Sequence, residues 1–384
     1  MSEEIAQPKK HRLIFIDVMR GLAVLWMIET HVVDANMFNY LKHGFFYTWL
    51  NISNGFIAVG FIFCAGCGFW LAAMRKSDDY RSFKKPLWVY LRRLGFVILM
   101  GYWLHIPNLS LQRLLSYSPA ELVSMFQCDV LHTIVIASVF ALILLFVIRN
   151  NKYLPYIYLA LAVIIIFISP PIRQMNSMSF MPPWLGTYFV GPPISKFPLF
   201  PWAAYFFAGA AFTALFYNVE DRRKFSIIVA ISGFSVAAIL FATRHITEGF
   251  MGVADWWQGS PQHTLFRLGG TVMTFSLLYL FENYYKNRKI GDVLRVCGQE
   301  SLFIYIFHLM VVYGSVVNLG LKQFVGNNLD YYGTFLVTLT LCVANYWLAF
   351  IWNGFKSRSP ELSFRVILSL SLLFLVVLIF NPFG

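Results

Sequence analysis

Runs of about twenty apolar residues recur along the whole chain, and they restrict its fold more than any other feature. They lie at 13–33, 52–74, 87–106, 129–148, 154–170, 198–217, 225–243, 265–282, 301–318, 333–355 and 363–381. A run of this length crosses the hydrocarbon core as an α-helix, which satisfies its own backbone hydrogen bonds. Only 12% of the 384 residues are charged, against about 25% in a soluble domain. We therefore predict an all-α, polytopic integral membrane protein with about eleven transmembrane helices, of which 154–170 is the shortest.

The distribution of basic residues predicts how these helices are oriented, because Lys and Arg concentrate on the cytoplasmic side. With a cytoplasmic N-terminus, 22 of the 30 basic residues face the cytoplasm, in segments 9–12, 75–93, 149–152, 222–224, 286–295 and 356–365. The opposite side keeps Lys42, Arg113, Arg173, Lys196, Arg244, Arg267 and Lys322. The C-terminus is then outside. The formal net charge of +12 follows from this topology, and we expect no nucleic-acid partner.

The chain reads as a single transmembrane domain over 1–384, since no hydrophilic stretch is long enough to fold separately. Cys64 and Cys67 form a C-x-x-C on a helix face of small residues, a pattern that favours close helix packing over a redox or metal role. The outward loops, above all 171–197 and 244–264, are rich in Pro, Trp and Tyr. Their aromatic residues suit the membrane interface and are equally compatible with binding a sugar ring.

Ionisable residues lie along one face of the first span, where they are costly unless they face a cavity or a partner. Arg20 and His31 are eleven residues apart, almost three helical turns, so they share a face about 16 Å apart along the axis. Asp17 and Asp34 join this stripe at spacings of three, whereas Glu29 falls nearly opposite. The stripe predicts a polar track across most of the membrane. An Asp17–Arg20 ion pair with an interfacial His31 is the simpler structural alternative.

Further histidines are predicted near the outer ends of other spans. His105 ends the third span, and Asp129 and His132 open the fourth, three residues apart on one face. Imidazoles beside carboxylates suit general acid–base chemistry near neutral pH. A zinc site is the competing interpretation, but no H-x-x-x-H pair and no Cys ligands accompany these residues, so we predict no metal.

Two other groups of polar residues allow both a functional and a structural interpretation. Tyr305 and His308 lie three apart on the ninth span, where they either line a cavity or form hydrogen bonds between helices. Lys84, Lys85, Arg92 and Arg93 precede or begin the third span. Basic residues there are expected from topology and lipid phosphates, and Arg is also well shaped to hold the phosphates of a ligand.

Five stretches carry a resemblance to a known group of membrane enzymes. FIDVMRGLAVLWMIETH (15–31) resembles the first helix of the transmembrane acyltransferases, whose acyltransferase-three branch carries an R-x10-H motif that Arg20 and His31 match. Four later stretches resemble the branch of heparan-alpha-glucosaminide N-acetyltransferase and its bacterial relatives: FIFCAGCGFWL, CDVLHTI, FPLFPWAAYFFAGAAF and GQESLFIYIFHL. They follow the family order across 12–310, which is most of the chain.

The resemblance implies a membrane-embedded acyltransferase that uses cytoplasmic acyl-CoA, with acetyl-CoA as the expected donor. The acceptor would be a hydroxyl or amine of a glycan or glycoconjugate on the outer side of a bacterial cytoplasmic (inner) membrane. Arg20, Arg92 and Arg93 would bind the CoA. His31, with Asp34 beside it, would take the acceptor's proton or be acylated transiently. His105, Asp129, His132 and His308 would surround the acceptor.

This chain departs from the heparan branch at the working histidine. In that branch an Asn tends to occupy the place of His31, and the histidine sits in the following loop in a KH pair. Lys42 and His43 supply such a pair here at a shifted spacing. Either His31 or His43 is therefore the candidate base, and we favour His31 because it lies within the helix on the Arg20 face.

Two other functions are compatible with part of the sequence. A secondary transporter would also need intramembrane charges, although no inverted repeat or matching pair of broken helices is visible. A non-catalytic scaffold would explain the loops but not the stripe from Arg20 to His31. A homodimer is one arrangement open to a polytopic enzyme.

Overall fold

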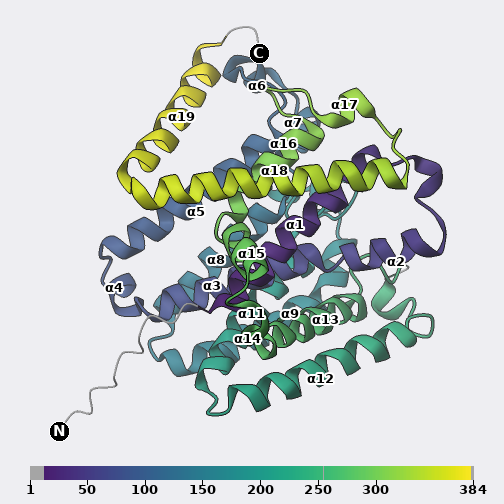
Figure 1. Cartoon of the computed structure of the whole chain (residues 1–384), viewed down its shortest axis with the longest axis vertical. Helices are drawn as coiled ribbons and strands as arrows, with labels where there is room; N and C mark the ends of the chain where they lie inside the picture. The colour runs from purple at the N-terminus through teal and green to yellow at the C-terminus, as the bar shows by residue number, and fades with distance from the viewer. Residues whose placement is uncertain (1–12, 254, 382–384) are drawn as a thin grey trace.

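The computed structural model describes residues 13–253 and 255–381, in which α-helices and short 3-10 helices are joined by loops (Figure 1). The predicted cytoplasmic flank of Lys9, Lys10 and Arg12 lies outside these residues. A helix occupies most of each predicted apolar run. These helices are α1 (Ile14–Asn36), α3 (Ile57–Met74), α5 (Lys85–His105), α8 (Val130–Val147), α9 (Leu154–Gln174), α11 (Leu199–Asn218), α12 (Arg222–Ala242), α13 (Pro261–Leu280), α16 (Ser301–Tyr313), α18 (Tyr331–Arg358) and α19 (Pro360–Phe380).

Shorter helices fill the connections between the long ones. They are η1 (Asn39–Leu41), α2 (Gly44–Asn54), α4 (Ser77–Arg81), α6 (Leu111–Ser116), α7 (Pro119–Phe126), η2 (Asn151–Tyr153), η3 (Ser177–Ser179), α10 (Pro183–Gly186), η4 (Phe250–Gly252), α14 (Glu282–Tyr285), α15 (Lys289–Gln299) and α17 (Leu321–Val325). The described part of the chain contains no strand, which confirms the all-α prediction.

Several helices have the length and apolarity of membrane spans, so the chain is an integral membrane protein. Within the described ranges, eight helical segments are long and apolar enough to cross a bilayer. The number becomes nine if α15 and α16, which meet at a bend of 79°, form one broken span. The helices α1 and α13 are not among them. Both the total of about eleven spans and the orientation of the termini stay predictions.

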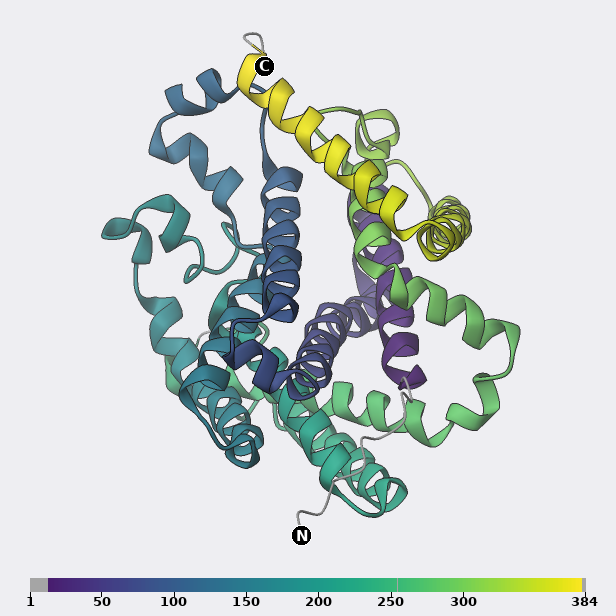
Figure 2. The same cartoon turned by 90° about the vertical axis from the view of Figure 1, so that its left-hand side faces the viewer.

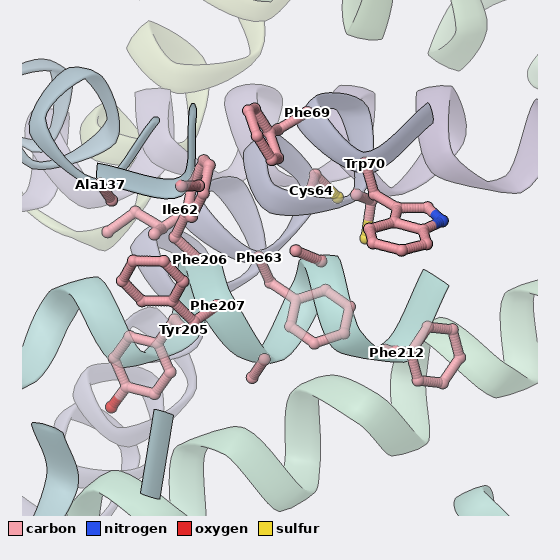
Figure 3. Close-up of a cluster of buried hydrophobic side chains, with 14 of the residues drawn as sticks. Ile62, Phe63, Cys64, Phe69, Trp70, Ala137, Tyr205, Phe206, Phe207 and Phe212 are labelled. Atoms are coloured by element: carbon pink, nitrogen blue, oxygen red, sulfur yellow. The ribbon is translucent and has the colours of Figure 1, made fainter. Parts of the chain in front are cut away.

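The centre of the fold is the contact between α3 and α11. Helix α11 is buried along most of its length and also packs on α8 and α9. Figure 3 shows Phe63 of α3 among Phe206, Phe207 and Phe212 of α11. The C-x-x-C cysteines, Cys64 and Cys67, belong to this core, where both thiols are free and buried. Their surroundings agree with a packing role.

Helix α1 is held between α3 on one side and α15, α16 and α18 on the other. Its Arg20 donates a hydrogen bond from Nη2 to Ser301 Oγ, 2.8 Å away, at the start of α16. The bend before Ser301 places buried Glu300 beside Lys356 and Asn353 of α18. Helix α18 packs on this side of α1, and α19 continues from the end of α18 at an angle (Figures 1 and 2). Most of the apolar surface of α18 and α19 is exposed, as expected for helices that face lipid. Helix α1 is thereby fixed in rotation, with the Arg20 face turned toward α16.

Arg81 caps the C-terminal end of α8, and its contacts there can be tested by substitution. Its guanidinium donates to the carbonyls of Leu145 and Ile148, at 3.1 and 2.8 Å, and to Asn151 Oδ1 at 2.7 Å. We expect Arg81→Met to reduce the free energy of unfolding by about 2 kcal/mol, because carbonyls at a helix end lose a charged donor. Thermal unfolding of the detergent-solubilised protein measures this. Lys152→Met, which removes an exposed cation nearby, is the control, and equal unfolding temperatures of the two variants would contradict the prediction.

Candidate active site

Several helix ends meet around a cavity of about 380 Å³ on the side predicted to face outward. The C-terminal part of α1 contributes His31, the end of α5 contributes His105, and the start of α8 contributes Asp129. Helix α16 adds Tyr305 and Tyr313 from the other side. The cavity is completed by Met27, Thr30, Asn54, Gly55, Ile57, Ala58, Leu104, Gln127, Val130, Lys196, Phe197, Trp202, Arg267, Leu309 and Gly314.

Asp129 is the buried carboxylate of this cavity, and its position follows from the start of α8. It is the N-cap residue, and its Oδ1 accepts a hydrogen bond from the backbone N–H of Leu131. The same oxygen accepts from the Tyr305 hydroxyl at 2.7 Å, and Oδ2 lies 3.1 Å from His105 Nε2. Asp129 therefore ties α5, α8 and α16 together, and both of its oxygens are occupied.

His105 is oriented by two neighbours. The Gln127 amide nitrogen lies 3.0 Å from His105 Nδ1 and can only donate, so Nδ1 accepts and the proton is on Nε2. That proton then points at the Asp129 carboxylate. Because both ring nitrogens are engaged, His105 has no free lone pair with which to remove a proton from a substrate.

His31 is oriented by different neighbours, and unlike His105 it keeps one ring nitrogen with a free lone pair. The Tyr313 hydroxyl donates to Asp34 Oδ2 at 2.8 Å, so the tyrosine has no second proton to give. His31 Nδ1 lies 3.1 Å from the same hydroxyl oxygen and must therefore be the donor in that contact. This places the proton on Nδ1 and leaves the Nε2 lone pair free. A half-buried imidazole with a free Nε2 in a cavity can act as a general base or a nucleophile.

The other predicted histidines lie outside the lining of this cavity. His308 is fully buried behind His31, with the two ring centroids 5.4 Å apart, and its Nδ1 donates to the Ile304 carbonyl at 2.7 Å. His132 is also fully buried, and its Nδ1 accepts from the Asp129 backbone N–H. His43 is exposed at the start of α2. The structure thus lines one cavity with His31, His105 and Asp129. His308 and His132 pack directly behind this lining, and His43 lies away from it at the surface.

His132 sits in an aromatic enclosure beside the cavity. Its ring lies 4.3 Å from that of Tyr102, whose hydroxyl shares a 2.7 Å hydrogen bond with Tyr188. Burial raises the pKa of Tyr188, so this hydroxyl stays protonated. The contacts of His132 are those of a packed polar residue.

The predicted CoA-binding arginines lie toward the opposite ends of their helices. Arg20 is half-buried against Ser301, about 16 Å from His31 along α1. Arg92 and Arg93 are exposed on α5, and the Arg92 guanidinium lies 4.8 Å over the Phe364 ring of α19. The three cations are therefore available to solvent or to a ligand at that side, but they do not line the cavity around His31.

Several cavity residues were not expected from the sequence. Tyr313, which orients His31, is 282 positions away in the chain, so no local spacing could indicate the pair. Lys196 and Arg267 did carry a signal, because they are among the few basic residues on the side predicted to face outward. In the described residues no group of three or more His, Cys, Asp or Glu side chains is arranged to hold a metal ion.

Comparison with known proteins places these residues in a family context. Residues 12–247 match the family model described as heparan-alpha-glucosaminide N-acetyltransferase, catalytic. The match covers well over half of the chain and includes His31, His105 and Asp129, whereas Arg267, Tyr305 and Tyr313 lie beyond it. No curated protein and no solved structure matches the chain.

Proposed function

The chain belongs to the heparan-alpha-glucosaminide N-acetyltransferase catalytic family, and from this premise we propose that it moves an acetyl group from cytoplasmic acetyl-CoA to an outward-facing glycan. The accepting atom is a hydroxyl oxygen or an amine nitrogen of the glycan or glycoconjugate. The membrane is the cytoplasmic membrane of a bacterium. Family membership supports the reaction class, and the orientation of the basic residues supports the two sides.

The free Nε2 of His31 carries this proposal. His31 lines a cavity of about 380 Å³, a volume suited to a sugar ring and an acyl group. His31 Nε2 takes the proton of the acceptor hydroxyl or amine as that atom attacks the thioester carbonyl carbon. The carbon–sulfur bond then breaks, and CoA leaves as the thiolate. Transient acylation of Nε2 is the alternative route and uses the same lone pair.

Arg20, Arg92 and Arg93 support the donor side of the proposal by their placement. A CoA molecule carries several phosphate charges, which guanidinium groups bind well. Arg20 shares the face of α1 that ends at His31, and it lies where α15 and α16 bend away from each other. In this proposal it holds the pantetheine–phosphate part of the donor, while the exposed Arg92 and Arg93 attract the nucleotide end.

Acetyl-CoA turnover by the purified protein tests the function. The protein in detergent is incubated with acetyl-CoA and a mixture of amino and neutral sugars, and free CoA is measured with a thiol reagent. We expect CoA release that depends on added sugar and an acetylated sugar detected by mass spectrometry. If the protein neither releases CoA nor binds acetyl-CoA, and if proteoliposomes that contain it take up sugar, the proposed function is wrong and the protein is a transporter.

Tyr313 is a positioning residue in this scheme, because it acts through His31. Tyr313→Phe keeps the ring and removes the oxygen that accepts from His31 Nδ1. The imidazole is then free to rotate or to carry its proton on Nε2, so we expect kcat to fall about tenfold. The KM for acetyl-CoA should stay within about twofold. Steady-state kinetics measure both quantities. The control is Tyr331→Phe, which removes an exposed tyrosine hydroxyl that bonds the carbonyl of Leu41.

A rise in KM with unchanged kcat would contradict this role for Tyr313. It would mean that the hydroxyl contributes to binding and not to the orientation of the base.

A further inference from the structure

A second cavity, of about 160 Å³, adjoins the cavity around His31 and shares Lys196, Trp202 and Arg267 with it. Its remaining wall comes from the end of α9, the loop before α11, the start of α11, the loop before α13 and the first turns of α13. The three cations at its surface are Arg173, Lys196 and Arg267. No Asp or Glu is among the residues that line it.

Arg173 is held rigidly at this cavity. Its guanidinium packs against the backbones of Gly191 and Gly259, and a Cβ atom at either glycine would collide with it. Gly259 also has a φ of +81°, a conformation that favours glycine. The side chain is half-buried, and within the described residues no Asp or Glu pairs with it.

Arg267 is also constrained, and it lacks a charged partner among the described residues. Its guanidinium lies 5.6 Å from the centre of the Trp202 ring and close to Gly55. The one carboxylate among the residues that line the adjoining cavity is Asp129, which is already bonded to Tyr305 and His105. Asp255, on the neighbouring loop, is exposed and accepts from the backbone of Trp257.

Cations that are half-buried without a counter-charge are costly, and like charges around one small cavity repel each other. Such an arrangement is stabilised when an anion enters. The position of these cations also points to an anionic ligand. Arg173, Lys196 and Arg267 lie on the side predicted to face outward, where basic residues are few and topology does not account for them.

We propose that this cationic cavity binds an acidic substituent of the acceptor, a carboxylate or a sulfate or phosphate ester, while the acceptor's reacting group lies at His31. The inference rests on the proposed function for the identity of the ligand as acceptor. Arg173 and Arg267 are the fixed donors to the anion, and exposed Lys196 closes the rim shared by the two cavities. Trp202 and Trp257 provide apolar surface for the sugar ring that carries the charge.

Binding of matched sugars tests this proposal without any acetyl-CoA. Saturation-transfer NMR titrations of the full chain in detergent compare glucuronate, glucose 6-sulfate and glucose 6-phosphate with neutral glucose. We expect at least one acidic sugar to bind about tenfold or more tightly than glucose, with a preference that weakens as salt is raised. The ranking of the three acids identifies which acidic group the cavity accepts.

Substitutions locate the effect. Lys196→Gln changes an exposed side chain and should fold normally, and Arg173→Gln removes the fixed donor; each should reduce the preference for the acidic sugar about ten- to a hundredfold. Arg244→Gln is the matched control, because Arg244 lies on the same outer side, outside both cavities, with its guanidinium over Phe241. Equal binding of glucose and all three acids to the wild type would overturn the proposal, as would a preference that survives both substitutions.

The outcome is separable from that of the catalytic proposal. If the protein prefers acidic sugars and loses this preference with Lys196→Gln, yet never releases CoA, the result supports the cationic site and contradicts the transferase function. If the protein acetylates neutral sugars and shows no preference for acidic ones, the result supports the transferase function and contradicts the cationic site.

Discussion

Replacing His31 with Gln is expected to lower sugar-dependent CoA release by about 10²- to 10⁴-fold, the usual contribution of a general base. The Gln amide can still donate to the Tyr313 oxygen, so the local packing survives. It cannot accept the acceptor's proton, because an amide nitrogen has no basic lone pair. The assay is kcat with saturating acetyl-CoA, and a thermal-unfolding curve within a few degrees of the wild type shows that the variant is folded.

Two other histidines serve as matched controls for His31. His43→Gln alters an exposed residue outside the cavity, and we expect activity within about twofold of the wild type. His105→Gln should have an intermediate effect, because His105 holds Asp129 but has no free nitrogen. If His43→Gln abolishes activity and His31→Gln does not, the working histidine follows the KH pattern of the family and the proposed role of His31 is wrong.

The helical architecture could be predicted because the signals behind it are local. Each apolar run is long enough to show by itself, and the structure forms a helix over most of each one. The stripe on α1 was visible for the same reason, since Arg20 and His31 are on one helix and fixed spacing sets their common face. Asp129 and His105 were likewise indicated by helix ends that lie close in the sequence.

Pairings across the chain could not be predicted. Asp129 and His132 have the same local signal, yet only Asp129 reaches the cavity, because His132 turns its Nδ1 back to the N–H of Asp129. Tyr313 acquires its role from contacts with His31 and Asp34, at the far end of the sequence. The bend between α15 and α16 is another such feature, since the break at Glu300 is stabilised by Lys356 and Asn353 from α18.

Substituting Gly66 is expected to have the largest effect on stability, because α3 and α11 touch through their backbones. A Cβ at Gly66 would collide with the carbonyl oxygen of Phe206, and a Cβ at Gly209 would collide with that of Phe63. The two glycines are reciprocal, so the helices cannot shift to accommodate one without disturbing the other. Overpacking of a rigid core costs about 1–3 kcal/mol and occasionally more, and we expect Gly66→Ala to cost about 3 kcal/mol.

Gly68 provides the control on the same helix, two residues from Gly66. It is exposed, and a Cβ there would meet nothing within 4 Å. Gly68→Ala should stabilise the protein by up to about 1 kcal/mol through helix propensity alone. Thermal unfolding in one detergent compares the pair, and Gly209→Ala should reproduce the loss seen with Gly66→Ala. Equal unfolding temperatures for Gly66→Ala and Gly68→Ala would mean that α3 and α11 do not meet backbone to backbone. The described packing at the centre of the fold would then be wrong.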